Sequence, residues 1–146
     1  MTEHKNGFSL VEVLVVLSIF ASVLGVALPS AVHAVRQMQG QQFIEQLSAD
    51  LYAAASEAIS HRGIVHVVVQ QQHSSYTVQR MWEMKRKRVT APPGFTIASN
   101  FASGTLSFND VGHVLQAGTI FITYPNGQRK RITVYMASGR FQIRAE

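Results

Sequence analysis

An uninterrupted apolar run near the N-terminus constrains this chain more than any other feature. Residues 8–28 contain a single ionisable side chain, Glu12. A helix over these 21 residues is about 31 Å long, which matches the roughly 30 Å hydrocarbon core of a bilayer. The run therefore predicts a membrane-spanning helix, with the short polar segment 1–7 and its Lys5 on the cytoplasmic side.

The helical pattern continues beyond the apolar run, to about residue 60. Pro29 removes one backbone hydrogen bond and predicts a kink at residues 27–29, not an end of the helix. Arg62-Gly63 is the expected stop, because glycine tolerates the left-handed conformation after a last turn. An apolar stripe at helical spacing predicts a face that packs on a soluble domain: Ile44, Leu47, Leu51, Ala54, Ala55 and Ala58.

After Gly63 the chain changes to short β-branched and aromatic runs separated by turn residues. The Asn126-Gly127 pair is a strong hairpin signal, because both residues accept the positive φ of a tight turn. Turn chemistry also explains Gly112, Gly118 and Gly139. The expected strands are 64–69, 76–82, 95–98, 105–108, 119–124, 131–136 and 140–144. The fold class is therefore α+β, a long N-terminal helix followed by a small antiparallel β domain.

The absence of cysteine limits how the β domain is stabilised. No disulfide, thiolate metal site or cysteine nucleophile is available to the chain. The part after His61 has about 85 residues, and a domain of that size buries only about two-thirds of its unfolded surface. We therefore expect the β domain to use the helix as part of its core.

Glu12 requires an explanation, because a carboxylate at mid-bilayer costs roughly 2.5 to 3.5 kcal/mol and is usually paired or functional. The segment Lys5-Asn6-Gly7-Phe8-Ser9-Leu10-Val11-Glu12 resembles the class III leader of type IV pilins and pseudopilins. That resemblance implies that a prepilin peptidase cuts after Gly7 and methylates the new N-terminus at Phe8. It also implies that Glu12 attracts the terminal amine of a neighbouring subunit. Such a pair offsets much of the desolvation cost of both charges.

The same resemblance divides the chain into four parts. These are a leader, 1–7; a transmembrane and assembly half-helix, 8–30; an amphipathic half-helix packed on the β domain, 31–61; and the antiparallel β domain, 62–146. Two other interpretations of the N-terminus remain open. Val32-His33-Ala34 fits the small-x-small rule of a conventional secretory signal, although the apolar run is longer than such signals have. In the second interpretation the apolar run is a plain signal anchor, and Glu12 has no function in it.

The last third of the chain carries a second resemblance, to minor pilins of the H-type pseudopilin group. Within that group the D-type minor pseudopilins of the competence pilus are the most similar, which implies a filament that captures DNA for transformation. A type II secretion pseudopilin or a fimbrial minor pilin has almost the same pattern. The residues concerned are Phe108-Asn109, Gly112-His113, Gly118-Thr119-Ile120, Ile132-Thr133-Val134-Tyr135 and Ser138-Gly139-Arg140.

Basic residues concentrate toward the C-terminus of a chain whose net charge is +5. From Arg80 onward they lie on predicted loops and the final hairpin, where one face could collect several. A run of basic residues is most often a solvated turn, and contact with double-stranded DNA is the second hypothesis. Under this second hypothesis the chain is a DNA-binding module at the filament tip. Its candidate residues are Lys85, Arg86, Lys87, Arg88, Arg129, Lys130, Arg131, Arg140 and Arg144.

Catalytic and cofactor chemistry has little support in the sequence. His61, His66 and His73 lack a metal-ligand spacing, and Asp110 with His113 has no identifiable nucleophile. No glycine-rich nucleotide motif is present. The sequence thus predicts a non-enzymatic pilin subunit without metal or cofactor. Its expected location is the cell membrane, single-pass, and then a surface filament. Its expected partners are other pilins or pseudopilins, the prepilin peptidase and the membrane.

Overall fold

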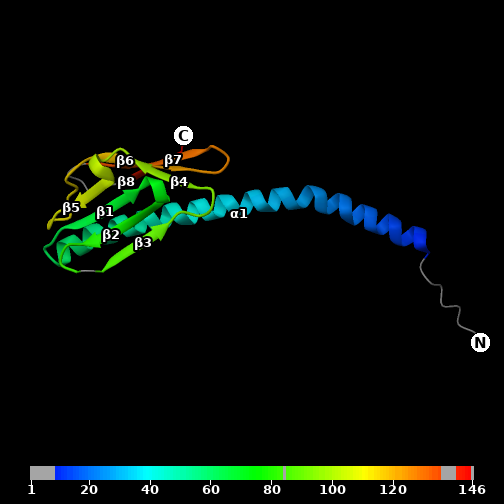
Figure 1. Ribbon diagram of the computed structural model, residues 1–146, viewed down its shortest axis with the longest axis horizontal. Coiled ribbons are helices and arrows are strands. Elements are labelled where there is room, and N and C mark those ends of the chain that lie inside the picture. Colours follow the sequence, from blue (N-terminus) through cyan, green and yellow to red (C-terminus); the bar gives the residue numbers. More distant parts are fainter. Residues whose placement is uncertain (1–8, 84, 136–140, 146) are drawn as a thin grey trace, which may run out of the picture. The chain divides into compact units, whose positions relative to one another are not determined.

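The computed structural model describes residues 9–83, 85–135 and 141–145. Its single long helix, α1, runs over Leu10–Ser60, and eight strands follow it in the described residues (Figure 1). The helix continues through Pro29, as expected, and the kink there stays a prediction. The chain separates into two compact units, Met1–Met38 and Gln39–Glu146.

The first unit consists of the N-terminal part of α1 in its described residues. Its large apolar side chains are exposed, among them Leu10, Val13 and Phe20. An 18-residue window of this helix has a mean hydropathy of 2.5, and none of the window is buried. By length and composition the helix is therefore suited to cross a membrane.

The second unit contains two antiparallel sheets of four strands each (Figure 1). The first sheet has the order β3-β2-β1-β5, with β1 at Val65–Gln70, β2 at Ser75–Arg80, β3 at Arg86–Thr90 and β5 at Thr105–Phe108. The second has the order β4-β6-β7-β8, with β4 at Thr96–Ser99, β6 at Gly118–Thr123, β7 at Arg129–Val134 and β8 at Phe141–Ala145. The α+β prediction is confirmed.

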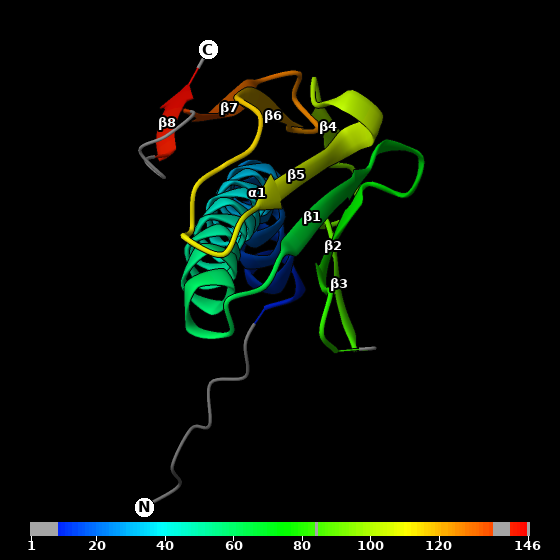
Figure 2. The ribbon, with the colours of Figure 1, turned by 90° about the vertical axis from the view of Figure 1, so that its left-hand side faces the viewer.

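The C-terminal half of α1 forms the centre of this unit. Figure 2 looks along the helix and shows one sheet on each of two sides of it. Leu47 and Leu51 are 0% exposed and share one apolar core with Val67, Ile120 and Ile132 from the strands. The apolar stripe predicted from helical spacing is therefore confirmed, and the β domain does use the helix as part of its core.

Gly40 permits a close approach between α1 and the second sheet. A Cβ atom at this buried position would lie 2.7 Å from Cε1 of Phe95 and 2.6 Å from Cζ of Tyr124. Glycine inside a helix is unfavourable by about 1 kcal/mol relative to alanine. Here that cost is offset because two aromatic rings, themselves in contact at 4.9 Å between centroids, pack directly on the helix backbone.

The helix ends at Ser60, as predicted, but the left-handed residue after it is not the expected glycine. Arg62, and not Gly63, has the left-handed conformation, with a φ of 46°. The Arg62 N–H donates to the carbonyl of Ile59 at 3.2 Å, and the Gly63 N–H donates to that of Ala58 at 3.1 Å. These two bonds form a Schellman motif with Arg62 at its left-handed position. Gly63 is required for space instead, because its Cβ would lie 2.6 Å from Cζ3 of Trp82.

The seven expected strands are present with bounds shifted by at most two residues, and one further strand, β3, was not expected. The basic run at Lys85–Arg88, expected as a turn, forms most of strand β3 from Arg86 onward. Strand β2 ends at Arg80, so that Trp82 lies outside it. Gly118 begins strand β6, whereas Gly112 and Gly127 have positive φ in turns, as expected. Gly139 lies outside the described residues.

Candidate functional site

Glu12 lies in the first turn of α1, where a carboxylate interacts favourably with the helix dipole. Its side chain is exposed, and it borders a shallow hollow with Val13, Val16 and Leu17. Among the described residues Glu12 has no ion-pair partner. Gly7 and Phe8 lie outside the described residues. The described residues 10–25 therefore present one carboxylate, an acceptor for a positive charge, among mainly apolar side chains.

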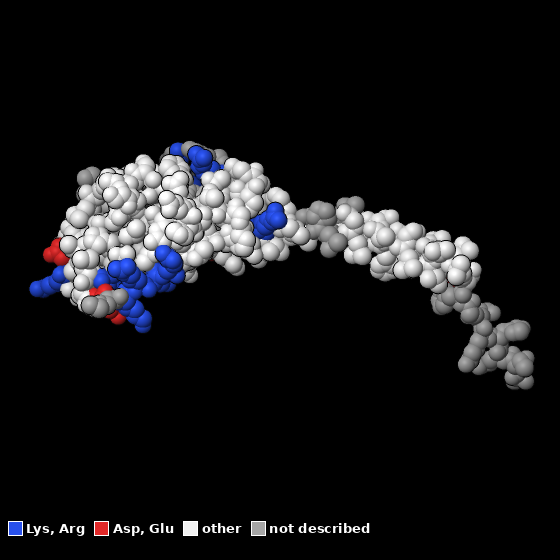
Figure 3. Space-filling view, in the orientation of Figure 1, with Lys and Arg blue, Asp and Glu red and all other residues white. Residues whose placement is uncertain are grey.

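Most of the described basic residues lie in strands. Arg131 and Arg144 lie in the strands of the final hairpin, as expected, whereas the run expected as a turn lies mostly in β3. Arg86, Lys87 and Arg88 belong to β3 of the first sheet, whereas Arg129, Lys130 and Arg131 belong to β7 of the second. Arg144 lies in β8 and pairs in register with Arg131. Arg140 lies outside the described residues. The two clusters are thus on different sheets. Figure 3 shows Lys and Arg, with acidic residues among them, gathered at the edge where Figure 1 places β3.

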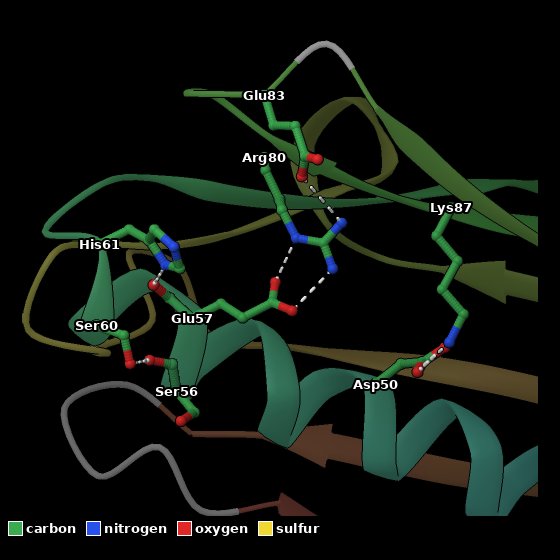
Figure 4. A network of polar contacts seen from close by, with 8 residues as sticks. All are labelled: Asp50, Ser56, Glu57, Ser60, His61, Arg80, Glu83 and Lys87. Atoms are coloured by element: carbon green, nitrogen blue, oxygen red, sulfur yellow. Dashed lines mark hydrogen bonds and ion pairs between the residues drawn. The ribbon is translucent and has the colours of Figure 1, made fainter.

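Carboxylates of α1 pair with cations of strands β2 and β3 (Figure 4). Glu57 accepts two hydrogen bonds from the Arg80 guanidinium, at 2.6 and 2.7 Å. These bonds lower the pKa of Glu57 and raise that of Arg80. Glu83 lies 3.7 Å from the same guanidinium. The pairing of Glu57 with Arg80 was not recognised from the sequence because the two residues are 23 positions apart.

Asp50 joins the C-terminal half of α1 to strands β2 and β3. It is 8% exposed and accepts hydrogen bonds from Lys87 at 2.7 Å, from the hydroxyl of Tyr76 at 2.8 Å and from Gln46 at 3.1 Å. Burial raises the pKa of Asp50, but the three hydrogen bonds together lower it below its ordinary value. Lys87, expected to be solvated or to contact DNA, is therefore used within the domain.

An open groove of about 740 Å³ runs beside these pairs. Residues of α1, β2, β3 and the intervening turn line it: Glu57, His61, Arg80, Trp82, Glu83, Lys85, Arg86, Lys87 and Arg88. The rings of His61 and Trp82 stack there, with centroids 4.7 Å apart and planes 11° from parallel. Trp82 also packs on Gly63, so its indole is engaged on the protein itself. Tyr76 and Tyr124, the other aromatics considered for base stacking, are buried in the core.

Two of the three basic residues of β7, Arg129 and Lys130, pack on aromatic rings. The Arg129 guanidinium lies 5.8 Å from the centroid of the Phe121 ring. The ammonium of Lys130 lies 5.5 Å from the centroid of the Tyr124 ring and donates to Oε1 of Gln41 at 3.0 Å. Cation–π contacts of this kind stabilise the sheet, so two of these three cations have roles within the fold.

The histidines considered for chemistry occupy separate places. Nδ1 of His66 is 2.7 Å from Oγ of Ser107, and Nδ1 of His61 is 3.2 Å from the Glu57 carbonyl. In the loop with Asp110, the His113 N–H donates to Oδ1 of Asn109 at 2.7 Å, which organises the turn. The residues described contain no group of three His, Asp or Glu that could hold a metal ion.

Residues 4–28 match the family described as the prokaryotic N-terminal methylation motif. No curated protein matches the chain in sequence. The fold is similar to that of the minor pseudopilin EpsH from the type 2 secretion system of Vibrio cholerae, with a TM-score of 0.57 and 16% identity over 75% of this chain and 95% of that one. It is also similar to the type IV minor pilin FimU of Pseudomonas aeruginosa, with a TM-score of 0.60 and 18% identity over 75% of this chain and 94% of that one. The chain thus has a pilin-like α+β fold behind an N-terminal methylation motif.

Proposed function

We propose that this chain is a minor pilin or pseudopilin subunit of a type IV-like filament. The observation that carries the proposal is the isolated, exposed carboxylate of Glu12 in the first turn of an apolar helix, within the methylation motif. In this proposal Gly7 is the last residue of the leader, Phe8 the methylated N-terminus, and Glu12 the acceptor for a neighbour's amine. The subunit spans the cell membrane once and then enters a surface filament.

The competence pilus is the filament that we propose. The order and spacing of the C-terminal motifs from Phe108 to Arg140 support it. A type II secretion pseudopilus and a fimbrial pilus are the alternatives, and proteins of both kinds are similar to this chain in fold. Other pilins or pseudopilins and the prepilin peptidase are the partners in each case. The genes beside this one would distinguish the three systems.

Processing of the N-terminus tests the proposed function. Co-expression with a prepilin peptidase is expected to give a protein that begins at methylated Phe8, because Gly7 precedes an apolar run too long for a conventional leader. Gly7→Ala should leave the full-length chain uncut. Intact-mass spectrometry checks both. An N-terminus at Val35 would show a conventional secretory signal and would refute the pilin proposal.

Binding of double-stranded DNA is a second candidate function. The open groove beside strands β2 and β3 is the observation that favours it. Lys85, Arg86 and Arg88 line the groove and have no carboxylate partner among the described residues. Three phosphate contacts would give a log-log salt slope near −2.7, since each contributes about 0.9. We expect weak binding by the full chain in detergent, roughly 10⁻⁴ to 10⁻⁶ M at physiological salt.

The variants that test DNA binding remove charge from one cluster at a time. Arg86→Gln should reduce the magnitude of the slope by about 0.9. Arg129→Gln is the matched control, because Arg129 lies on the other sheet and packs on Phe121. Anisotropy titrations at several salt concentrations measure both. An equal loss in the control would show that only net charge matters.

A further inference from the structure

Strand β3 is an edge strand whose outer backbone groups are open. In the first sheet β2 is its only neighbour among the described strands. The Ala91 N–H donates to the Ser74 carbonyl at 2.8 Å, so Ala91 and Ser74 form a hydrogen-bonded pair of this ladder. Every second residue of β3 counted back from Ala91 therefore also points its backbone groups toward β2. Because antiparallel hydrogen-bonded pairs alternate, the N–H and C=O groups of Arg86, Arg88 and Thr90 point away from β2.

The opposite edge of the same sheet is covered by the chain itself. The Leu115 N–H donates to the Ser107 carbonyl of β5 at 3.0 Å, and Val114 forms a bridge with Phe108. The fold thus closes one edge of this sheet with its own loop and leaves the β3 edge available for pairing.

The side chains of β3 divide between the two faces of the sheet. Lys87 reaches Asp50 on α1, and Val89 packs against the core. Arg86, Arg88 and Thr90 are exposed on the other face, since side chains alternate along a strand. Arg88 also donates to Oε1 of Gln70 at 2.6 Å, which orients its guanidinium. The three residues with open backbone groups therefore also present exposed side chains, two of which are cationic.

A second copy of this chain does not suit that edge. Pairing β3 with β3 would place cations directly opposite or next to each other, and like charges across a ladder are destabilising. No other described strand offers a complement, because the eight described strands contain no Asp or Glu. Their eight Lys and Arg residues are Arg80, Arg86, Lys87, Arg88, Arg129, Lys130, Arg131 and Arg144.

We propose that the β3 edge binds an extended acidic segment of a different protein as an additional antiparallel strand. Backbone hydrogen bonds to Arg86, Arg88 and Thr90 would hold the segment, and carboxylates at alternate positions would lie opposite Arg86 and Arg88. The partner is expected to be acidic because its carboxylates complement the positive charges of Arg86 and Arg88. The proposal goes beyond the filament function, and it does not rest on processing at Gly7 or on the role of Glu12.

Double-stranded DNA would use the same cations but not the backbone groups, and this difference makes the two ligands separable. Thr90→Pro removes one outward N–H without changing the charge. An edge strand tolerates proline where the N–H faces away from its neighbour, so the ladder to β2 is retained. Thr90→Val keeps the N–H and is the matched control.

The experiment uses the full chain in detergent micelles and a fluorescein-labelled peptide with Glu at every second position and Thr or Val between. Fluorescence anisotropy should show binding that Thr90→Pro weakens by at least about tenfold and Thr90→Val leaves unchanged. Arg86→Gln, Arg88→Gln and a peptide with Gln for Glu should each weaken it as well. Binding of a DNA duplex should be insensitive to Thr90→Pro.

Two results would overturn the proposal. If Thr90→Pro binds the acidic peptide as well as the wild type, the attraction is charge alone and the groove serves DNA or another polyanion. If the wild type does not bind the peptide at low salt, the basic edge serves only to prevent self-association. Circular dichroism checks that Thr90→Pro is folded. If Thr90→Pro is not folded, Arg88→Pro compared with Arg88→Gln repeats the test at a second outward N–H.

Discussion

Filaments sheared from cells that express the Glu12→Ala variant are expected to lack this subunit. The variant should still be inserted in the membrane, because removal of a carboxylate from an apolar helix favours insertion. It should fail to assemble because the neighbour's ammonium would then be desolvated without a partner. Truncating one member of a buried charge pair costs roughly 3 to 5 kcal/mol, which corresponds to a loss of incorporation of about a hundredfold or more.

The control for Glu12 is a carboxylate elsewhere on the same helix. Glu45 is exposed, lies in the second unit and accepts a hydrogen bond from Gln41, so Glu45→Ala removes one charge from the same element. Immunoblots of membranes and of sheared filaments report insertion and assembly separately. Normal incorporation of Glu12→Ala would contradict the assembly role even if cleavage at Gly7 is confirmed.

Asp50→Ala is expected to destabilise the second unit by about 2 to 4 kcal/mol. The substitution leaves the buried hydroxyl of Tyr76 without its acceptor and Lys87 without its counter-ion. Lys87 is about half exposed and can turn to water, so most of the cost comes from the hydroxyl and from the cavity. Urea unfolding in detergent, followed by the fluorescence of Trp82, measures the change in free energy.

A double-mutant cycle isolates the buried contact. Tyr76→Phe alone removes the hydroxyl but leaves a carboxylate with two other donors, so its cost should be near 1 kcal/mol. In the Asp50→Ala background the same change should cost nothing or be stabilising, because no unsatisfied hydroxyl remains. Additive costs in the two single variants and the double variant would show that the contact carries no energy.

Acid should remove the contribution of Asp50 in a predictable direction. The pKa of Asp50 in the folded chain lies below its ordinary value, so its pairing stabilises the fold above about pH 4 and is lost as the pH falls through the lower, folded pKa. Asp50→Asn retains a hydrogen-bond acceptor but cannot ionise. The stability difference between wild type and Asp50→Asn should therefore shrink as the pH is lowered below 4.

Periodicity was sufficient to predict most of the fold, because it follows from which side chains must be buried. Helical spacing of Leu47, Leu51 and Ala54 identified the buried face of α1. The Asn126-Gly127 turn identified the β6–β7 hairpin. Strand β3 was missed because Arg-Lys-Arg has low β propensity and no apolar alternation. Its position depends on Asp50, which lies 37 residues earlier in the chain.

The candidate site could be predicted only where a linear motif contains it. Gly7, Phe8 and Glu12 lie within the residues that match the methylation motif, so their pattern is visible in the sequence. Which cations are neutralised was not visible, because Glu57 and Asp50 face strands that come later in the chain. The choice of Arg62 over Gly63 for the left-handed position also depends on tertiary packing, since the Trp82 indole occupies the space beside Gly63.

The order of elements along the chain also determines when the core can form during synthesis. The apolar face of α1 is synthesised before every strand that covers it, and Ile132 of β7 follows Leu51 by about 80 residues. At 5 to 20 residues per second, that face remains uncovered for about 4 to 16 s of synthesis. During this interval the nascent chain presents an amphipathic helix without its sheets.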